Sequence, residues 1–383
     1  MADQRKELLI VSFSDINADA RVLKQVRLFR DTYDVTTASF GQAPEGVSQH
    51  IQLPVMDTLR AVNGRYILLH QYRAAYWRIP AIRAAWKALR GKKFDLAIAN
   101  DLDAVPLVAR LKLRYGFHAD LHEYYPALHE DDPSWARYRK PWILWLCKHY
   151  LPQATSCTTV SGGLQKAYRE YCGLDVDIVP NATPYAALLP RAVSEPIKLV
   201  HSGACLRNRH LDVTLQAVQE SDAPVTIDLY LTPNDPPFLQ YLKDTYASER
   251  IVFHDPVPYV QLVDTLNRYD VGVHLMIPSN FNNTWALPNK VFDYVQARLG
   301  ILIGPSPEMM KLVNDAQNGI IAKGFEAQDL VASLKLLTVE RVQQLKAASD
   351  SVAKELSAEN QMGAWVSALD NIASLDRMVS EGL

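Results

Sequence analysis

The sequence predicts an α/β protein built from two Rossmann-like, doubly wound domains that face each other across a cleft. Short apolar runs of strand length alternate with longer amphipathic runs of helix length, which is typical of parallel sheets covered by helices. The alternation starts again near residue 195. The 383 residues also exceed one ordinary core and suit two domains of about 150–200 residues.

The first half of the chain holds the strands of the first expected sheet. Amphipathic runs such as 19–31 separate them and serve as the crossover helices. The expected strands are LLIVSF (8–13), YDVTTASF (33–40), FDLAIAND (94–101), HADLHE (118–123), CTTVS (157–161) and VDIVPN (176–181).

A Pro- and Ala-rich stretch, 181–196, separates this half from a second set of strands and is typical of an interdomain linker. The second set is IKLVHSG (197–203), VTIDLYL (225–231), RIVFHDPV (250–257), VGVHLMI (271–277) and GILIG (300–304). We therefore expect one domain over residues 1–182 and a second over 195–357. The remaining segment, 358–383, is expected to be helical, and its apolar stripe needs a surface to pack on.

Composition excludes several classes of protein. A formal net charge of −2 gives no general attraction to nucleic acid, so no nucleic-acid partner is expected. The four cysteines match no zinc or CxxC spacing and are expected to be buried thiols. No run has the length of a signal-peptide core or of the ~20 residues that span a bilayer, so we expect a cytoplasmic protein.

The segment WALPNKVFDYVQA (285–297) carries the strongest functional signal, because ligands of doubly wound sheets bind at the carboxyl ends of strands. An extended, Pro-containing stretch opens a helix at about Asn289, which places Lys290 in the first turn. Free N–H groups and a lysine at a helix start attract a phosphate. Asp293, three residues further on, could accept hydrogen bonds from a ribose diol. The alternative is an incidental i,i+3 ion pair.

Two other strand ends carry polar side chains. In HSGACLRNRHLD (201–212), Arg207 and Arg209 follow a strand and Gly203, where a guanidinium can clamp a phosphate. In LHEYYP (121–126), His122 stands at the mouth of the first sheet and could donate a hydrogen bond to a sugar or a leaving group. Solvated loop residues are the alternative for both.

Several motifs together resemble bacterial glycosyltransferases of family 4, in the subfamily with an LPNK-type loop. They occur in the family's order, from about residue 8 to about residue 375: FSDINADARVLKQ, DLHEYYP, TVSGGL, IVPNA, the strand–glycine–basic loop and ALPNKVFDYVQARLGILIG. The resemblance implies the GT-B fold, with the sugar nucleotide on the carboxyl-terminal domain and the acceptor on the amino-terminal one. It implies that the last helix crosses back to the first domain. It also implies transfer that retains anomeric configuration without a metal ion.

The resemblance also implies roles for single residues. Arg209 matches a basic residue on the diphosphate, Asp293 a glutamate on the donor ribose, and His122 a histidine that faces the transferred sugar. Lys290 is expected to stabilise the leaving diphosphate.

We place three more residues, Asn289, Leu287 and Gly203, in the donor site. The chain departs from the family at Trp285, where a first glutamate is usual, and at Ala204, where an arginine is common. The usual small-residue turn and proline after the donor loop are replaced by Arg298 and Gly300.

The predicted function is transfer of a sugar from a nucleotide-diphosphate sugar to a hydroxyl acceptor, in surface glycan or glycoconjugate biosynthesis. A UDP-sugar donor is favoured over a GDP-sugar, and neither a cofactor nor a metal is expected. One alternative is a nucleotide-sugar 2-epimerase, which would use carboxylates such as Glu123, Glu130 and the Asp131-Asp132 pair. The other is a non-catalytic nucleotide-sugar-binding subunit. The Asp101-Leu102-Asp103 triplet resembles a metal-binding DxD, but Asp103 is expected to cap a helix instead.

Residues 65–93 hold eight Lys or Arg and no Asp or Glu. Their apolar residues recur at roughly helical spacing, broken by Pro80. This pattern is typical of a peripheral anchor at the inner face of an anionic membrane, which would favour a glycan or lipid-linked acceptor. The alternative is a helix that covers the sheet and exposes a solvated basic face.

Overall fold

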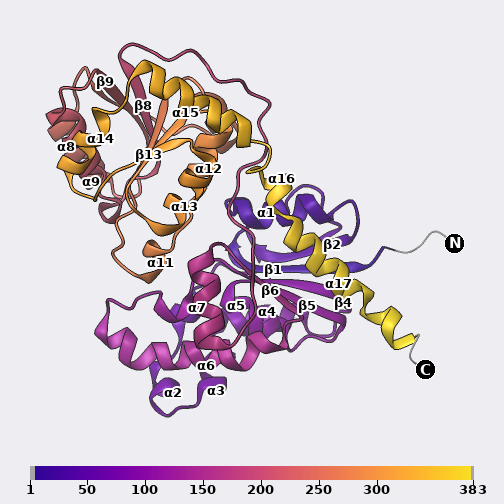
Figure 1. The fold of residues 1–383 in the computed structure, drawn as a ribbon. Helices are drawn as coiled ribbons and strands as arrows, with labels where there is room; N and C mark the ends of the chain where they lie inside the picture. Colours follow the sequence, from indigo (N-terminus) through magenta and orange to yellow (C-terminus); the bar gives the residue numbers. More distant parts are fainter. Residues whose placement is uncertain (1–4, 381–383) are drawn as a thin grey trace. The chain divides into compact units, whose positions relative to one another are not determined.

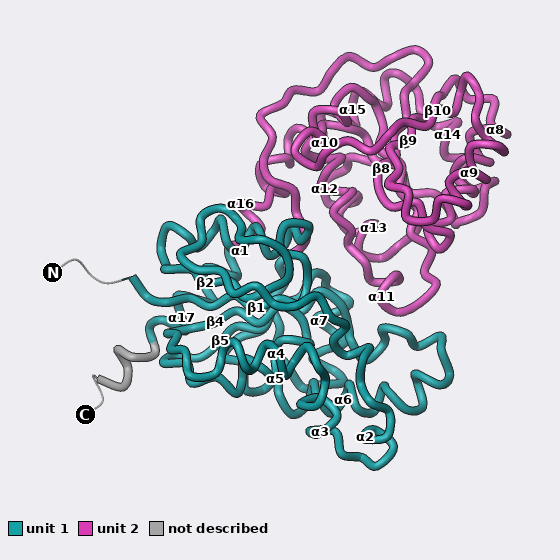
Figure 2. Tube along the Cα trace, turned by 180° about the vertical axis from the view of Figure 1, so that it is seen from behind, with its two compact units in different colours: residues 1–179, 363–383 teal, residues 180–362 magenta. Residues whose placement is uncertain are grey.

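The computed structural model describes residues 5–380, with side chains described as far as residue 374. The chain ends 1–4 and 381–383, assigned above to the first domain and to the final helical segment, lie outside the described residues (Figure 1). The described chain forms two compact units (Figure 2). The first comprises the chain up to residue 179 together with the segment from residue 363 onward, and the second comprises residues 180–362.

The first unit is built on a seven-stranded parallel sheet of order β3-β2-β1-β4-β5-β6-β7. The strands are β1 (Glu7–Asp15), β2 (Asp34–Phe40), β3 (Gln49–Gln52), β4 (Phe94–Asn100), β5 (Leu113–Leu121), β6 (Ser156–Thr159) and β7 (Asp177–Ile178). Because β1 pairs with both β2 and β4, the strand order reverses there. Ligands of doubly wound sheets bind at such a switch point.

Helices connect these strands and pack on the sheet. They are α1 (Ala20–Phe29), α2 (Gly64–Leu68), α3 (Tyr72–Trp77), α4 (Pro80–Leu89), α5 (Asp101–Val108), α6 (Lys140–Tyr150), α7 (Gly162–Cys172) and α17 (Gly363–Ser380). The last of these, α17, packs on β4, β5 and β6 and buries Trp365, Leu369 and Ile372. The Trp365 Nε1–H donates to Thr158 Oγ1 at 3.2 Å, which fixes the helix on the sheet.

The second unit is built on a six-stranded parallel sheet of order β10-β9-β8-β11-β12-β13. Its strands are β8 (Ile197–Ala204), β9 (Val225–Thr232), β10 (Ile251–His254), β11 (Val271–His274), β12 (Gly300–Ile303) and β13 (Gly319–Ile321). Here the order reverses at β8, which pairs with both β9 and β11. The two sheets confirm the predicted fold class of two doubly wound α/β structures.

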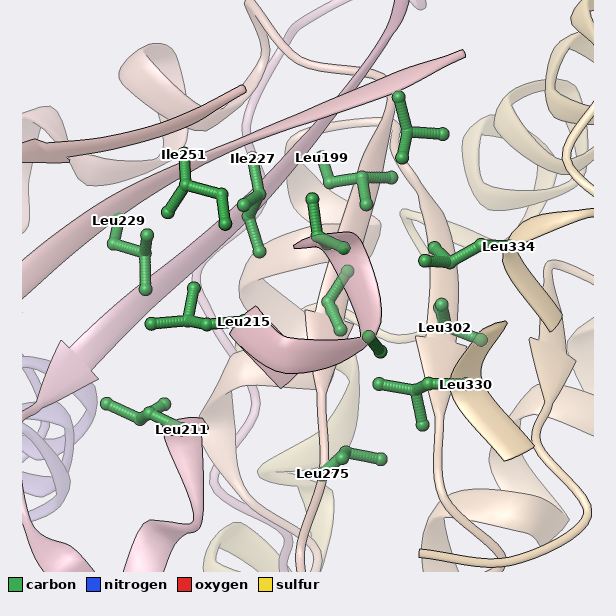
Figure 3. Close-up of a cluster of buried hydrophobic side chains, with 14 of the residues drawn as sticks. Leu199, Leu211, Leu215, Ile227, Leu229, Ile251, Leu275, Leu302, Leu330 and Leu334 are labelled. Atoms are coloured by element: carbon green, nitrogen blue, oxygen red, sulfur yellow. The ribbon is translucent and has the colours of Figure 1, made fainter. Parts of the chain in front are cut away.

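The helices of the second unit cover both faces of its sheet. They are α8 (Leu211–Glu220), α9 (Pro236–Tyr246), α10 (Tyr259–Leu266), α11 (Phe281–Thr284), α12 (Asn289–Gln296), α13 (Pro307–Ala316), α14 (Ala327–Leu334), α15 (Val339–Val352) and α16 (Ala358–Gln361). Figure 3 shows part of one core cluster, in which Leu211 and Leu215 of α8 lie with Ile227 and Leu229 of β9. These four side chains are at most 4% exposed, so burial of apolar area holds the two elements together.

The structure differs from the sequence-based expectation at two sheet edges and one helix start. The edge strands β3 and β13 were not predicted, because one is polar and partly exposed and the other has three residues. Asp103 does not cap a helix, and that prediction is wrong: α5 begins at Asp101, which has a left-handed φ of 65°. Asp103 therefore lies inside the first turn.

Candidate functional site

Two cationic side chains meet over a glycine at the carboxyl edge of the second sheet. Gly203, near the end of β8, has a φ of 136°, a conformation that residues other than glycine rarely adopt. A Cβ atom at this position would lie 2.6 Å from Lys290 Nζ and 2.7 Å from its Cε. The Lys290 side chain thus crosses the Gly203 backbone, and a Cβ at this position would displace the end of the lysine.

The Lys290 ammonium has no hydrogen-bond or ion-pair partner within the part of the chain that the structure describes. Burial and the nearby Arg209 lower its pKa, while Asp293 acts in the opposite direction. Arg209 lies in the short turn Arg207–Arg209. Its Nη1 donates to Met276 Sδ, a weak acceptor, at a distance of 3.3 Å. Two neighbouring cations with no carboxylate in ion-pair contact among the described residues favour a bound anion, although Asp293 acts on Lys290 from a longer distance.

The start of α12 adds backbone donors to this site. The helix begins at Asn289, as predicted, and the preceding Pro288 gives it no side-chain cap. First-turn N–H groups of such a helix are free to point at an anion. Asn289 itself is exposed, and Leu287 is half-buried against another cluster of buried apolar side chains in the same unit.

Asp293 lies one turn further along α12 and is 1% exposed. Its Oδ1 accepts a hydrogen bond from Thr183 Oγ1 at 2.5 Å, which ties the segment after β7 to the helix. The structure therefore brings Gly203, Arg209 and Lys290 together and places Asp293 beside them in a buried, hydrogen-bonded position.

In the first unit, His122 directly follows β5 and is held by two carboxylates. Its backbone N–H donates to Asp101 Oδ1 at 3.0 Å, and its Nδ1 lies 3.1 Å from Asp101 Oδ2. Its Nε2 lies 3.4 Å from Asp120 Oδ2. Burial lowers the pKa of His122, but the two carboxylates outweigh burial and raise it to about 10. The imidazole, whose side chain is 21% exposed, is therefore a cation at neutral pH.

Asp120 is the centre of a buried network that the sequence analysis did not identify. Its carboxylate is fully buried and accepts two hydrogen bonds of 2.7 Å from the Arg21 guanidinium. Gln25 Nε2 and Thr158 Oγ1 donate to it at 2.8 and 2.7 Å. The signal was present in the motif FSDINADARVLKQ, which contains both Arg21 and Gln25.

A cavity of about 590 Å³ opens at the same carboxyl edge of the first sheet. Its walls combine aromatic rings with carboxylates and basic side chains, among them Phe13, Asp103, Glu123, Tyr125, Arg139 and Trp142. Tyr125 Oη donates to Asp103 Oδ2 at 2.8 Å, which joins the loop after β5 to α5. Among the described residues that line this cavity, Glu123 is present, whereas Glu130, Asp131 and Asp132 are not.

The pH dependence of stability tests the environment of His122. Its folded pKa is raised, so its contribution is complete below the unfolded value of about 6.5 and is lost as pH rises towards about 10. We expect the free energy of unfolding of the wild type, measured in urea, to fall as pH rises over this range. His122→Gln should remove this pH dependence and lower the free energy of unfolding by about 2–4 kcal/mol at pH 6.

His118, which lies in β5 itself, provides the control. Burial lowers the pKa of His118 to about 4, so this ring stays neutral throughout the range. His118→Gln should leave the slope between pH 6 and 10 unchanged whatever it does to overall stability. Equal slopes in the wild type and His122→Gln would contradict the assignment.

Comparison with known proteins shows which family profile and which solved folds this chain resembles. Residues 26–185 match the sequence profile of Glycosyltransferase Family 4. No curated protein sequence matches the chain. Among solved structures, sucrose-phosphate synthase from Thermosynechococcus elongatus has a TM-score of 0.68 and 13% identity over 99% of this chain and 100% of its own.

Two further structures share the architecture. HepE from Anabaena, solved in complex with UDP-glucose, has a TM-score of 0.69 and 12% identity over 96% of this chain and 100% of its own. The alpha,alpha-trehalose 6-phosphate synthase from Burkholderia multivorans has a TM-score of 0.68 and 11% identity over 99% of each chain. These likenesses establish the GT-B fold.

The solved structures show the GT-B fold, and the match of residues 26–185 to the Glycosyltransferase Family 4 profile indicates a glycosyltransferase. The match to family 4 lies almost entirely in the first unit, which holds His122 and the cavity. Within residues 5–380, no helix is long and apolar enough to cross a membrane.

Proposed function

We propose that this protein transfers a sugar from a nucleotide-diphosphate sugar to a hydroxyl group of a glycan or lipid-linked acceptor. The observation that carries the proposal is the Lys290 ammonium, which lies over Gly203 next to Arg209 without a partner in the described residues. A UDP-sugar is favoured as donor, because HepE, which shares the fold, was solved with UDP-glucose.

The acceptor is assigned to the cavity of the first unit. Partly exposed aromatic rings such as Phe13 and Tyr125 suit the apolar faces of sugar rings, and Glu123 and Asp103 can accept hydrogen bonds from hydroxyl groups. The cavity lies at the carboxyl edge of the sheet, where ligands of such folds bind. His122, a cation at that edge, is assigned to the transferred sugar, as the family resemblance implies.

The reaction is a displacement at the anomeric carbon. The acceptor oxygen forms a bond to that carbon, the bond to the diphosphate breaks, and the hydroxyl proton passes to the leaving phosphate. Arg209, Lys290 and the first-turn N–H groups of α12 stabilise the charge that develops on the diphosphate. We propose that these cations make a metal ion unnecessary and that the configuration at the anomeric carbon is retained.

A donor panel followed by mass spectrometry tests this function. The wild type is incubated with UDP- and GDP-sugars and a mixture of glycan and polyprenyl acceptors, with and without EDTA. A product heavier than the acceptor by one sugar, formed equally in EDTA, is the expected result. Conversion of the donor to an epimer without an acceptor would indicate the epimerase, and binding without turnover would indicate a non-catalytic subunit.

Variants of Asp293 and Thr183 test whether Asp293 binds the donor or only supports the fold. We expect Asp293→Ala to weaken UDP binding by about 10- to 100-fold, because a charged hydrogen-bond partner is worth about 1.5–3 kcal/mol. Thr183→Val removes the same internal hydrogen bond but keeps the carboxylate, so it should leave UDP affinity within about threefold. Calorimetric titration measures both. Equal losses in the two variants would mean that Asp293 acts only through the fold.

The basic segment 65–93 supports a restricted form of the expected membrane contact. It forms α2, α3 and α4. Four of its apolar residues, Tyr76, Ile79, Ile82 and Leu89, are buried in the core and cannot face a membrane, whereas Leu68 and Leu69 are exposed.

A basic surface remains outside. The exposed cations include Arg73, Arg83, Lys87 and Arg90, and the last three of these line a groove of about 580 Å³. In that groove the Arg110 guanidinium lies 4.5 Å from the ring centre of Trp77 and 4.6 Å from that of Trp86. We propose that this surface binds the headgroups of an anionic membrane electrostatically and thereby places the enzyme at the inner face of the cell membrane, near a lipid-linked acceptor.

Liposome flotation tests the membrane contact. We expect the protein to float with phosphatidylglycerol vesicles at low salt and to sediment at high salt, because each basic residue near an anionic surface contributes about 1 kcal/mol that salt screens. Changing Arg73, Arg83, Lys87 and Arg90 to glutamine should abolish flotation. The control changes four exposed cations of the second unit to glutamine, Lys243, Lys335, Arg341 and Lys354. Sedimentation of the wild type at low salt would refute the contact.

A further inference from the structure

Two buried histidines lie in the carboxyl-terminal halves of neighbouring strands in the second unit, and the proposed function does not use them. His201 belongs to β8, and His274 is the last residue of β11. Their rings stack with centroids 5.7 Å apart and planes inclined by 25°. His201 is held in place because its Nδ1–H donates to the Val273 carbonyl at 2.9 Å. His274 thus packs against a ring that the backbone fixes.

His274 has no hydrogen-bond partner at either ring nitrogen among the described residues, although it is only 2% exposed. A neutral imidazole carries one N–H donor and one acceptor nitrogen. Burying either without a partner costs free energy, so such groups are rare in folded proteins. Two orphan nitrogens on one ring therefore point to a group that a ligand supplies.

The charges around His274 indicate which ligand. The titratable groups that act on it are Lys290 of α12, Arg209 of the turn after β8, and His201 itself. Burial and these cations lower the pKa of His274 well below its usual range, and they lower the pKa of His201 to about 4. Asp293 acts on Lys290 from the next turn of α12. The ring is therefore neutral in the unliganded protein, and the cations beside it oppose its protonation.

An anion bound by Lys290 and Arg209 would give the ring nitrogens of His274 a hydrogen-bond partner and would reduce the repulsion that opposes protonation of the ring. Its oxygens would accept a hydrogen bond from the ring, and its negative charge would offset Lys290 and Arg209, so that the ring could gain a proton. We propose that His274 is a further donor-site residue that donates a hydrogen bond to the bound diphosphate and becomes partly protonated from solvent as it binds. The assignment rests on the proposed function, because it takes the diphosphate of the nucleotide as the anion.

Calorimetric titration with UDP tests both parts of this assignment. The titration is run at pH 7.5 in buffers of different ionisation enthalpy, where free UDP is almost fully ionised because its last pKa is about 6. We expect the wild type to take up a fraction of a proton per UDP, increasing as pH falls. His274→Phe, which keeps a ring in the core, should lose this uptake and bind UDP roughly 10- to 100-fold more weakly. His274→Gln keeps a donor but cannot take up a proton, so it should recover much of the affinity and none of the uptake.

The outcomes distinguish this assignment from the function on which it rests. If neither UDP nor inorganic pyrophosphate binds the wild type, the diphosphate site and the role of His274 are both wrong. If UDP binds and His274→Phe retains full affinity and full proton uptake, His274 is a core residue and this assignment alone is refuted.

A measurement on the wild type tests proton uptake by His274 even if the His274 variants do not fold. Wild-type protein and His201→Gln are both labelled with ¹⁵N-histidine. One ring signal that both proteins show should shift toward imidazolium values when UDP saturates the site at pH 7.5. If no ring moves, His274 does not take up a proton.

Discussion

Lys290→Met is expected to lower turnover by about 10²- to 10³-fold, since removing one preorganised donor to a developing negative charge costs about that much in other enzymes. The methionine keeps an apolar stem across Gly203, so the change removes the charge and little else. UDP affinity should fall as well, because Arg209 and the start of α12 would hold the diphosphate without their partner cation. Initial rates with the donor found in the panel, and UDP calorimetry, measure the two effects.

The same variant should not lose stability. Burial lowers the pKa of Lys290, which means that the fold disfavours its charged form, and no described residue pairs with the ammonium. We expect the melting temperature of Lys290→Met to equal or exceed that of the wild type, in line with the trade-off between stability and activity at functional sites.

Lys311→Met is the matched control, with the same charge change on an exposed lysine of the second unit that pairs with Asp315. It should leave turnover within about twofold, since exposed ion pairs contribute little. Full activity of Lys290→Met, or its unfolding, would contradict the site.

The strands that could be predicted from the sequence are those marked by a local run of apolar residues. Apolar runs such as 8–13 and 225–231 form inner strands of the two sheets, and their composition alone distinguishes them from the helices between them. β3 has a polar, partly exposed sequence, and pairing with β2 rather than composition makes it a strand. Asp103 looked like a helix cap because its contacts with Tyr125 and the Leu59 backbone come from distant segments.

The donor site divides in the same way. Arg209, Lys290 and Gly203 were predictable because each stands at a strand or helix end, where the fold class places ligands. That these residues lie close together in space could not be predicted, since the contact between Lys290 and Gly203 joins residues 87 positions apart in the sequence. His274 and Asp120 were not predicted as functional residues for a related reason. Each lies within or at the end of an ordinary apolar strand, and only the tertiary structure shows which charges surround it.

Asp120→Asn is expected to destabilise the first unit by about 3–5 kcal/mol, the usual cost of removing one partner from a buried ion pair. The variant leaves the Arg21 guanidinium, 4% exposed, without a counter-charge, and an amide cannot accept all the hydrogen bonds that Arg21, Gln25 and Thr158 now donate. Arg21 also lies 4.6 Å from the ring centre of Trp365, so the disturbance should reach α17. Urea unfolding followed by tryptophan fluorescence suits the measurement, because six of the seven tryptophans belong to the first unit.

The pH dependence of this effect identifies its origin. Arg21 and His122 outweigh burial and hold the pKa of Asp120 well below its usual value. Its contribution is therefore complete above the unfolded value of about 3.9 and is lost as pH falls towards the folded one. The difference between the wild type and Asp120→Asn should accordingly shrink below about pH 4 and stay constant from pH 5 to 6.

An exposed aspartate of the same unit gives the control. Asp175→Asn removes a carboxylate that is 92% exposed and pairs with Arg169, so it should change stability by less than about 1 kcal/mol. A second variant, Arg21→Met with Asp120→Leu, removes both buried charges and should recover part of the loss, because an apolar pair of similar size needs no counter-charge. If Asp120→Asn is as stable as Asp175→Asn at pH 6, Asp120 is not the centre of the network that holds α1, β5 and α17 together.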